Sequence, residues 1–170
     1  MTDLISFSDT RYGEGRCRAG HGLFNTALGI GGVLLVILSQ ASLAACTIAA
    51  TPVSLGSYDV FSTSPNDNGI GTLTIVCGGG PGNNYLVTLS MGQSGGYTTR
   101  VMKSGANPLN YNLYTDAART TIWGDGTGGS SFMTAAKNAT TTLNVYGRIP
   151  AGQDVPAGSY TDNITATVTF

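Results

Sequence analysis

Histidine, glutamate and cysteine, the residue types best suited to catalysis and metal binding, are few and unevenly placed in this sequence. His21 and Glu14 are the sole residues of their types, and both lie near the start of the chain. A chain from residue 46 onward has no imidazole for a catalytic triad or a zinc site, and no glutamate acid or base. The carboxylates that remain are too scattered for paired acid–base work, namely Asp59, Asp67, Asp116, Asp125, Asp154 and Asp162. We therefore expect no enzyme, no cofactor and no metal site.

The first part of the chain has the three parts of a secretory signal peptide. Arg11, Arg16 and Arg18 precede the uncharged stretch 23–38, and small residues follow at 41–45. A positive segment, an apolar segment and a small-residue cleavage region in this order are typical of export signals.

Cleavage is expected after Ala44 or Ala45, so residues 1–45 are predicted to be the signal peptide and 46–170 the domain. A transmembrane anchor is the alternative. The strongly apolar run at 29–38 is only about half of the roughly 20 residues that cross a bilayer, which favours the cleaved signal.

The three cysteines agree with export. Cys17 falls in the predicted signal peptide, which leaves Cys46 and Cys77 as an even pair, so we predict one disulfide between them. The segment 43–46 also resembles a bacterial lipobox. In that alternative Cys46 would carry a lipid and Cys77 would remain a free thiol.

Composition excludes some functions and favours one fold class. The chain has 170 residues with a net charge of −1, only 10% charged residues and 25 glycines. Without a basic excess, nucleic acid is not an expected partner. Abundant glycine and threonine with little charge favour an all-β domain with many turns.

Apolar and polar residues alternate along most of the chain after residue 45, which predicts strands rather than helices. The segments 72–77 and 85–91 are predicted to form a hairpin, and Pro52 marks an edge or a change of sheet in the first strand. Six or seven strands at this spacing indicate a β-sandwich, with the clearest candidates at 46–55, 72–77, 85–91, 109–114, 141–147 and 159–170.

The stretch 115–136 has no clear period. Its glycine-rich run 123–129 and the run 78–82 lack the helix start and the lysine that a phosphate loop needs. Asp125 alone supplies too few oxygens for calcium. Trp123 is read either as a core residue or as part of an exposed adhesive loop.

Arg148 is a candidate ion-pair partner for Asp154 or Asp162. At the surface such a pair would contribute little, on the order of 0–1 kcal/mol.

Three segments resemble the spore coat protein U domain family, whose members include subunits of archaic chaperone–usher (Csu-type) pili. They are YGRIPAGQ with the following residues to Asp162, LNYNLYTD at 109–116, and the opening around Cys46 to Asp59. The likeness covers essentially all of 46–170.

This resemblance implies an immunoglobulin-like pilin sandwich that lacks its final strand. A groove between the first and last strands would then take a strand from a periplasmic chaperone, and later from a neighbouring subunit delivered through an outer-membrane usher. The apolar face of the last strand would line the groove, with Ile164, Ala166, Val168 and Phe170. Alternation alone also fits the last strand of a complete sandwich.

Polymerising members carry a donor segment before the first cysteine, whereas Cys46 directly follows the predicted cleavage site. The resemblance therefore implies an adhesive subunit near the tip, which accepts a strand but donates none. It would be exported to the periplasm and then to the cell surface, with a role in biofilm attachment and no small-molecule substrate. The alternative is a secreted or lipid-anchored binding module outside any fibre.

Overall fold

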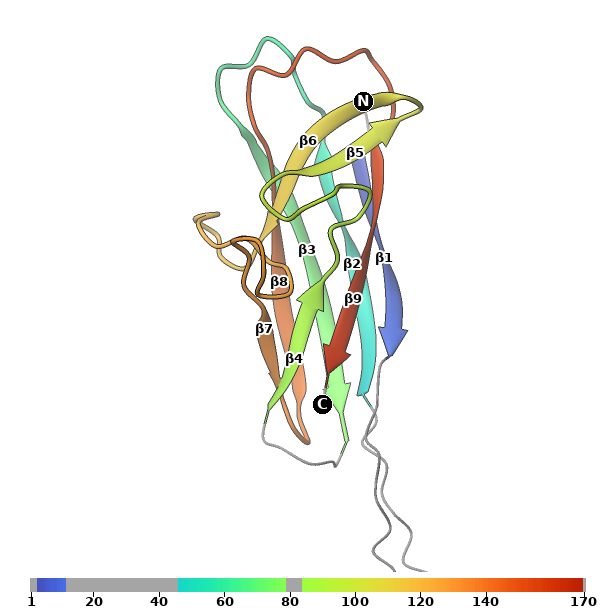
Figure 1. Ribbon diagram of the computed structural model, residues 1–170, viewed down its shortest axis with the longest axis vertical. Coiled ribbons are helices and arrows are strands. Elements are labelled where there is room, and N and C mark those ends of the chain that lie inside the picture. The colour runs from blue at the N-terminus through green and yellow to red at the C-terminus, as the bar shows by residue number, and fades with distance from the viewer. Residues whose placement is uncertain (1–2, 12–45, 79–83, 170) are drawn as a thin grey trace, which may run out of the picture.

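Alternating apolar and polar residues give a structure built from long strands (Figure 1). The computed structural model describes residues 3–11, 46–78 and 84–169, and for residues 3–11 it describes the backbone alone. The strands are β1 (Asp3–Arg11), β2 (Cys46–Gly56), β3 (Asn66–Cys77), β4 (Asn84–Leu89), β5 (Arg100–Ser104), β6 (Asn107–Tyr114), β7 (Met133–Ala136), β8 (Thr140–Ile149) and β9 (Thr161–Thr169). The described residues contain no helix that could span a bilayer.

Most of the predicted signal peptide lies outside the described residues. The apolar stretch, the small-residue region, His21, Glu14 and Cys17 all fall within 12–45. The prediction of a cleaved signal therefore stays a prediction. Strand β1 belongs to the same 1–45 range, where no strand was expected.

The strands form a sheet that returns on itself. Their order is β1-β2-β3-β8-β6-β5-β9-β4-β7, and β1 also pairs with β9. The β1–β9 pairing is parallel, and the others are antiparallel. Consequently β1 joins the first strand of the domain to its last.

The predicted hairpin between 72–77 and 85–91 is wrong. Strand β3 pairs with β2 and β8, whereas β4 pairs with β7 and β9. Both strands nevertheless contribute to one buried cluster, with Leu73 from β3 and Val87 from β4. The chain therefore passes from one layer of the sandwich to the other between these strands, because this places both apolar faces against the same core.

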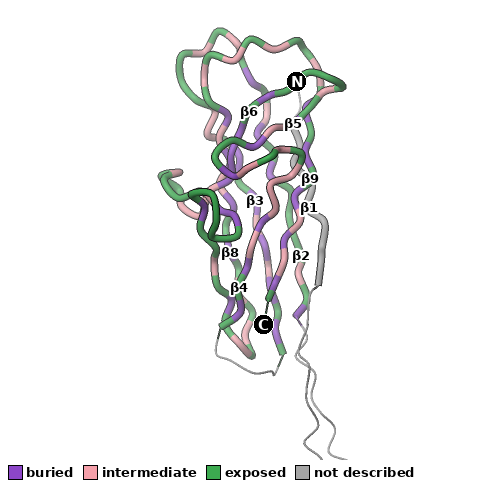
Figure 2. Tube along the Cα trace, viewed as in Figure 1, coloured by how far each residue is buried: buried purple, intermediate pink, exposed green. Residues whose placement is uncertain are grey.

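The core lies between the layers, as the buried positions along the strands show (Figure 2). Every second residue of β3, β8, β4 and β9 points inward. The all-β sandwich expected from the alternation is confirmed. The buried aliphatic residues of these strands are Leu73, Ile75, Leu143, Val145, Val87, Leu89, Ile164, Ala166 and Val168.

Pro52 sits at an irregularity in β2. The register of β2 against β3 shifts between Thr51 and Ser54, so the strand bulges there. Proline has no backbone N–H to offer the ladder, which is why a bulge suits it. Beyond the bulge, Val53 and Leu55 are fully buried.

Candidate strand-accepting site

The residues predicted to line a groove lie on the inner face of β9. Ile164, Ala166 and Val168 are buried in the core, and Asp162 is buried on the same face. Phe170 lies outside the described residues. The polar residues between them, such as Asn163 and Thr169, face outward and are exposed.

One edge of β9 is occupied by β1 over eight residue pairs. The register runs in parallel from Leu4 opposite Thr161 to Arg11 opposite Val168. A strand has two edges, and β4 and β5 pair with β9 at its two ends, at Ala166–Thr169 and at Thr161. Strand β1 therefore covers the whole of the edge that β4 and β5 leave.

Strand β2 meets β1 over a shorter length. Within the described residues the two pair at Val53, Ser54 and Gly56. Earlier in β2, Ala50 is exposed although it is paired with the fully buried Leu73. Directly paired residues share a face of the sheet, so the core-facing side of β2 is open to solvent at Ala50.

Ser90 extends the attachment of β9 beyond the β4 ladder. Its backbone N–H donates to the Thr165 carbonyl at 2.9 Å, and its hydroxyl accepts from the Thr165 N–H at 2.9 Å. Thr165 directly precedes Ala166, the first residue of β9 that pairs with β4. Ser90 thereby holds the middle of β9 in place.

Arg100 in turn fixes Ser90 from inside the protein. This side chain is fully buried, and its guanidinium donates to the carbonyls of Ser90 and Trp123 and to Oδ1 of Asn112. Burial lowers the pKa of Arg100 from its ordinary value, although an arginine stays charged at neutral pH. Nothing in the spacing of the sequence marked Arg100, because a lone cation predicts a surface residue.

Asp162 is held by hydrogen bonds at the start of β9, on the same buried face as Ile164. Its carboxylate accepts from the hydroxyl of Tyr111 at 2.6 Å, from the backbone N–H of Gln93 at 3.0 Å and from its own neighbour Asn163 at 2.8 Å. Burial and the Asp162 charge raise the pKa of Tyr111 well above its ordinary value, so the phenol stays a donor. These contacts tie β6 and the residues after β4 to β9.

A disulfide between Cys46 and Cys77 joins the start of β2 to the end of β3. The two residues are directly opposite in the antiparallel ladder, with their Cα atoms 4.1 Å apart. Because its sulfur is bonded to Cys77, this arrangement of Cys46 counts against the lipid attachment.

Trp123 lies in the core, which is the favoured of its two readings. It is fully buried and donates from Nε1 to the Val87 carbonyl at 3.0 Å, so the alternative of an exposed adhesive loop is wrong. Arg148 pairs with Asp67 rather than with Asp154 or Asp162, through two bonds of 2.6 and 2.7 Å. Strand β8 places Arg148 near the start of β3, and β6 and β5 separate β8 from β9 in the sheet order.

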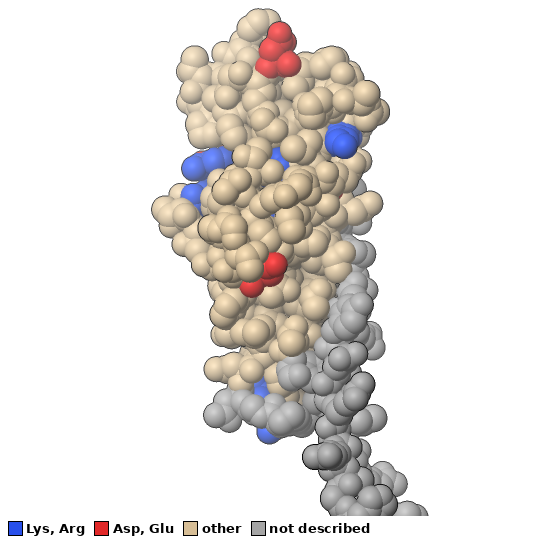
Figure 3. Space-filling model, in the orientation of Figure 1, with Lys and Arg blue, Asp and Glu red and all other residues tan. Residues whose placement is uncertain are grey.

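This arrangement has the features that strand addition requires. Two strand edges and an apolar inner face recognise an extended peptide through main-chain hydrogen bonds and side-chain contacts. In the part of the chain that the structure describes, no three His, Cys, Asp or Glu side chains gather to hold a metal. Charged side chains are also sparse on the face shown in Figure 3.

The fold and the site together define an all-β sandwich whose first and last strands are bridged by an added strand. The sequence profile of the Spore Coat Protein U domain matches residues 33–167, and the chain belongs to this family.

Two comparisons place the chain among known proteins. Over 81 residues it is 36% identical to "Protein U" of Myxococcus xanthus, an alignment that covers 46% of this chain and 45% of that protein. The chain thus spans less than half the length of the curated relative it matches. It is also similar, at 24% identity and a TM-score of 0.47, to a chain in the crystal structure of the CsuC-CsuE chaperone-tip adhesion subunit pre-assembly complex from the archaic chaperone-usher Csu pili of Acinetobacter baumannii. This match covers 75% of this chain and 40% of that one.

Proposed function

We propose that this protein is an exported structural and adhesive subunit of a chaperone–usher fibre, which acts by accepting a strand from a partner. The observation that carries the proposal is the position of β1, which is hydrogen-bonded to both β2 and β9. A strand fits between these two edges, and its role is to bind, not to catalyse.

The origin of β1 supports the need for an outside partner. Residues 3–11 belong to the segment 1–45 that is expected to be removed on export. Their removal would leave the edge of β9 without its eight-residue partner. An open edge beside an apolar face pairs readily with other chains and causes aggregation, so it has to be covered. In this proposal a periplasmic chaperone covers it first, and a neighbouring subunit replaces the chaperone at the outer-membrane usher.

The predicted cleavage site suggests a position near the tip of the fibre. If the exported chain starts at or near Cys46, no donor segment precedes the domain. The subunit then accepts a strand without giving one, as an attachment subunit in a biofilm would. N-terminal sequencing of the exported protein tests this point, and a start well upstream of Ala41 would contradict it.

A matched pair of alanines in β2 tests strand acceptance itself. Ala49 and Ala50 are both exposed, but Ala50 shares the face of the buried Leu73 whereas Ala49 is paired with Thr74 on the outer face. We expect Ala50→Lys to place a charge against an incoming strand and to abolish co-purification with a periplasmic pilus chaperone that binds the unaltered chain. Ala49→Lys should co-purify as the unaltered chain does. Equal binding by both variants would contradict the proposal.

A secreted binding module outside any fibre is the second candidate. The observation that favours it is an open polar pocket at residues 57–68, in the connection from β2 to β3 and the first residues of β3, with no residue of β9 in its lining. A chain that is soluble and monomeric without residues 3–11 and without a chaperone would support this candidate. Incorporation of labelled palmitate would point to its lipid-anchored form, whereas an intact Cys46–Cys77 bridge counts against it.

A further inference from the structure

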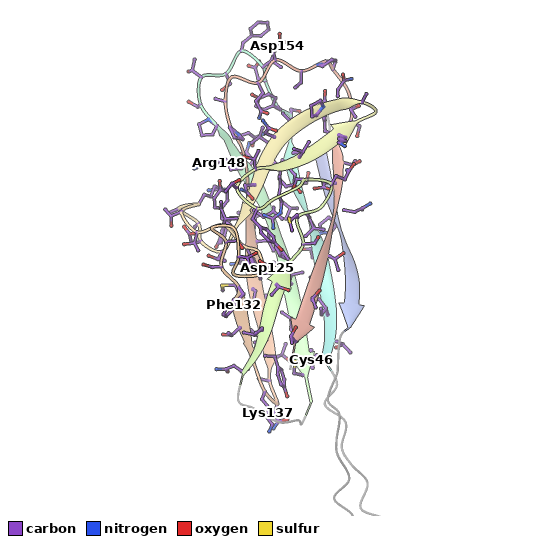
Figure 4. The ribbon with its side chains drawn as sticks, viewed as in Figure 1. Cys46, Asp125, Phe132, Lys137, Arg148 and Asp154 are labelled. Carbon is purple, nitrogen blue, oxygen red and sulfur yellow. A yellow bond between two sulfur atoms is a disulfide. The ribbon has the colours of Figure 1, made fainter. Side chains whose placement is uncertain are left out.

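The connection between β2 and β3 encloses a pocket of about 290 Å³. It lies at the pole of the molecule, which we define as the end formed by residues 57–65 and 150–160. Figure 1 shows these two loops together, and Figure 4 places Asp154 at this end and Cys46 and Lys137 toward the other. The volume lies near the lower limit of small-molecule sites, roughly 300 Å³, and suits a ligand of one or two rings.

The pocket presents unused hydrogen-bonding groups. Among the described residues, the hydroxyl of Ser64 and the carboxamide of Asn68 make no side-chain hydrogen bond. Asp59 uses Oδ1 to accept from the Phe61 N–H at 3.0 Å and leaves Oδ2 without a described partner. The pocket thus offers a hydroxyl, an amide and a carboxylate oxygen, a set that binds both donors and acceptors of a ligand.

Charge at the pocket disfavours an anionic ligand. The other carboxylate in the lining, Asp67, is neutralised by its paired bonds to Arg148. No cation lines the pocket, and Asp59 repels anions, so phosphate and sulfate are poor ligands. Described side chains do not gather there into a metal-binding group. A neutral ligand rich in hydroxyl groups can use the hydroxyl, the amide and the carboxylate oxygen of this lining together.

The loop that supplies part of the lining also carries an exposed aromatic residue. Phe61 lies between the lining residues Asp59 and Ser62, and it is 90% exposed. A large aromatic side chain left in water gains free energy when a flat apolar surface covers it. A sugar ring has such a surface on its C–H face and hydroxyl groups around its edge, so it matches Phe61 and the polar lining at once.

The pocket is held in shape before any ligand arrives. Asn66 donates from Nδ2 to the carbonyls of Leu55 and Ser57 at 2.9 and 3.1 Å. The hydroxyl of Tyr58 donates to the Pro150 carbonyl at 3.1 Å and accepts from the Gln153 N–H at 2.9 Å. Groups fixed in this way lose little entropy on binding. We propose that the pole of this protein binds a neutral sugar residue of a glycan, between Phe61 and the pocket lined by Asp59, Ser64 and Asn68.

The test is binding of the purified full chain to immobilised oligosaccharides that end in glucose, galactose, mannose or N-acetylglucosamine, with sialylated versions alongside. We expect retention on at least one neutral glycan. Asn68→Ala and Phe61→Ala should each weaken it roughly tenfold or more, as loss of a hydrogen bond or a ring contact would. Phe132→Ala is the matched control, since Phe132 is 44% exposed and lies away from the pole (Figure 4).

Several outcomes would overturn the proposal. They are failure of the unaltered chain to bind any neutral glycan, preference for the sialylated versions, and equal weakening by Phe132→Ala and Phe61→Ala. Attachment to polystyrene that needs Phe61 but not Asn68, without glycan binding, would also overturn it. Should a variant misfold, chemical-shift mapping on the unaltered chain decides. The free sugar should perturb residues 57–68, and perturbation elsewhere alone would refute the site.

Discussion

The guanidinium of Arg100 donates two hydrogen bonds to the backbone carbonyl of Ser90, at 3.1 and 2.9 Å. Ser90 then bonds through both its backbone and its hydroxyl to Thr165 of β9. A buried cation thus supports β9, the strand on which the proposed strand-accepting site depends, although Arg100 does not bond to β9 itself.

Replacing Arg100 by methionine is expected to destabilise the fold by about 3–5 kcal/mol, because the carbonyls of Ser90 and Trp123 and Oδ1 of Asn112 would lose their donor inside the protein. Urea denaturation of the purified chain measures the loss. Lys103→Met is the control, since Lys103 is exposed on the same strand. A loss below about 1 kcal/mol for Arg100→Met would show that water satisfies these groups.

Gly92 has a φ of +65°, and a Cβ atom there would lie 2.1 Å from Oδ2 of Asp162. Gly92→Ala should therefore cost about 2–4 kcal/mol, from the left-handed backbone and from displacement of the Asp162 carboxylate. Gly96→Ala is the matched control, since a Cβ there meets open space. Thermal melting of both variants tests the contrast, and similar melting temperatures would refute it.

The disulfide closes a loop with a sequence separation of 31. Replacing Cys46 and Cys77 together by serine should lower the free energy of unfolding by about 3–4 kcal/mol, chiefly because the unfolded chain gains freedom. Denaturation of the variant beside the unaltered chain measures this. An unchanged midpoint in the double variant would contradict the expectation.

Asp67 links stability to pH through Arg148. The hydrogen bond from Arg148 holds the pKa of the Asp67 carboxyl below its usual value of 3.8, with Arg119 adding to the effect. A carboxyl with a lowered folded pKa stabilises the protein above its unfolded pKa, and the contribution disappears as pH falls through the folded pKa.

We therefore expect Asp67→Asn to cost less than about 1 kcal/mol at neutral pH, since Asp67 is 36% exposed, and to cost nothing once the pH is well below 3.8. Unfolding curves across this pH range measure the difference. Asp154→Asn, at an exposed position, should differ little from the unaltered chain throughout. A cost for Asp67→Asn that grows on acidification would contradict the linkage.

Periodicity was a good guide to the long strands and a poor guide to their partners. The alternation around Ile164, Ala166 and Val168 predicted β9, because one face of that strand meets the core and the other meets solvent. The same reasoning could not pair β3 with β8, since neighbours in sequence need not be neighbours in a sandwich. Strands β5 and β7 are too short, at five and four residues, for a period to stand out.

The buried polar residues could not be predicted from the sequence, for a different reason. Arg100 and Asp162 are buried because carbonyls, an amide and a phenol from distant segments converge on them. Such convergence depends on tertiary structure, and composition carries no trace of it. The partner of Arg148 was misjudged similarly, because Asp67 is 81 residues away in sequence but lies nearby in the fold.

The direction of β9 has a mechanical consequence. Strands β1 and β9 run along the longest axis of the molecule, with their ladder extending over eight residue pairs (Figure 1). A strand held there and pulled lengthwise would load all of its hydrogen bonds in shear at once, instead of opening them one after another. If the protein attaches cells as proposed, a flow that pulls on such a cell would have to break the whole ladder in a single event.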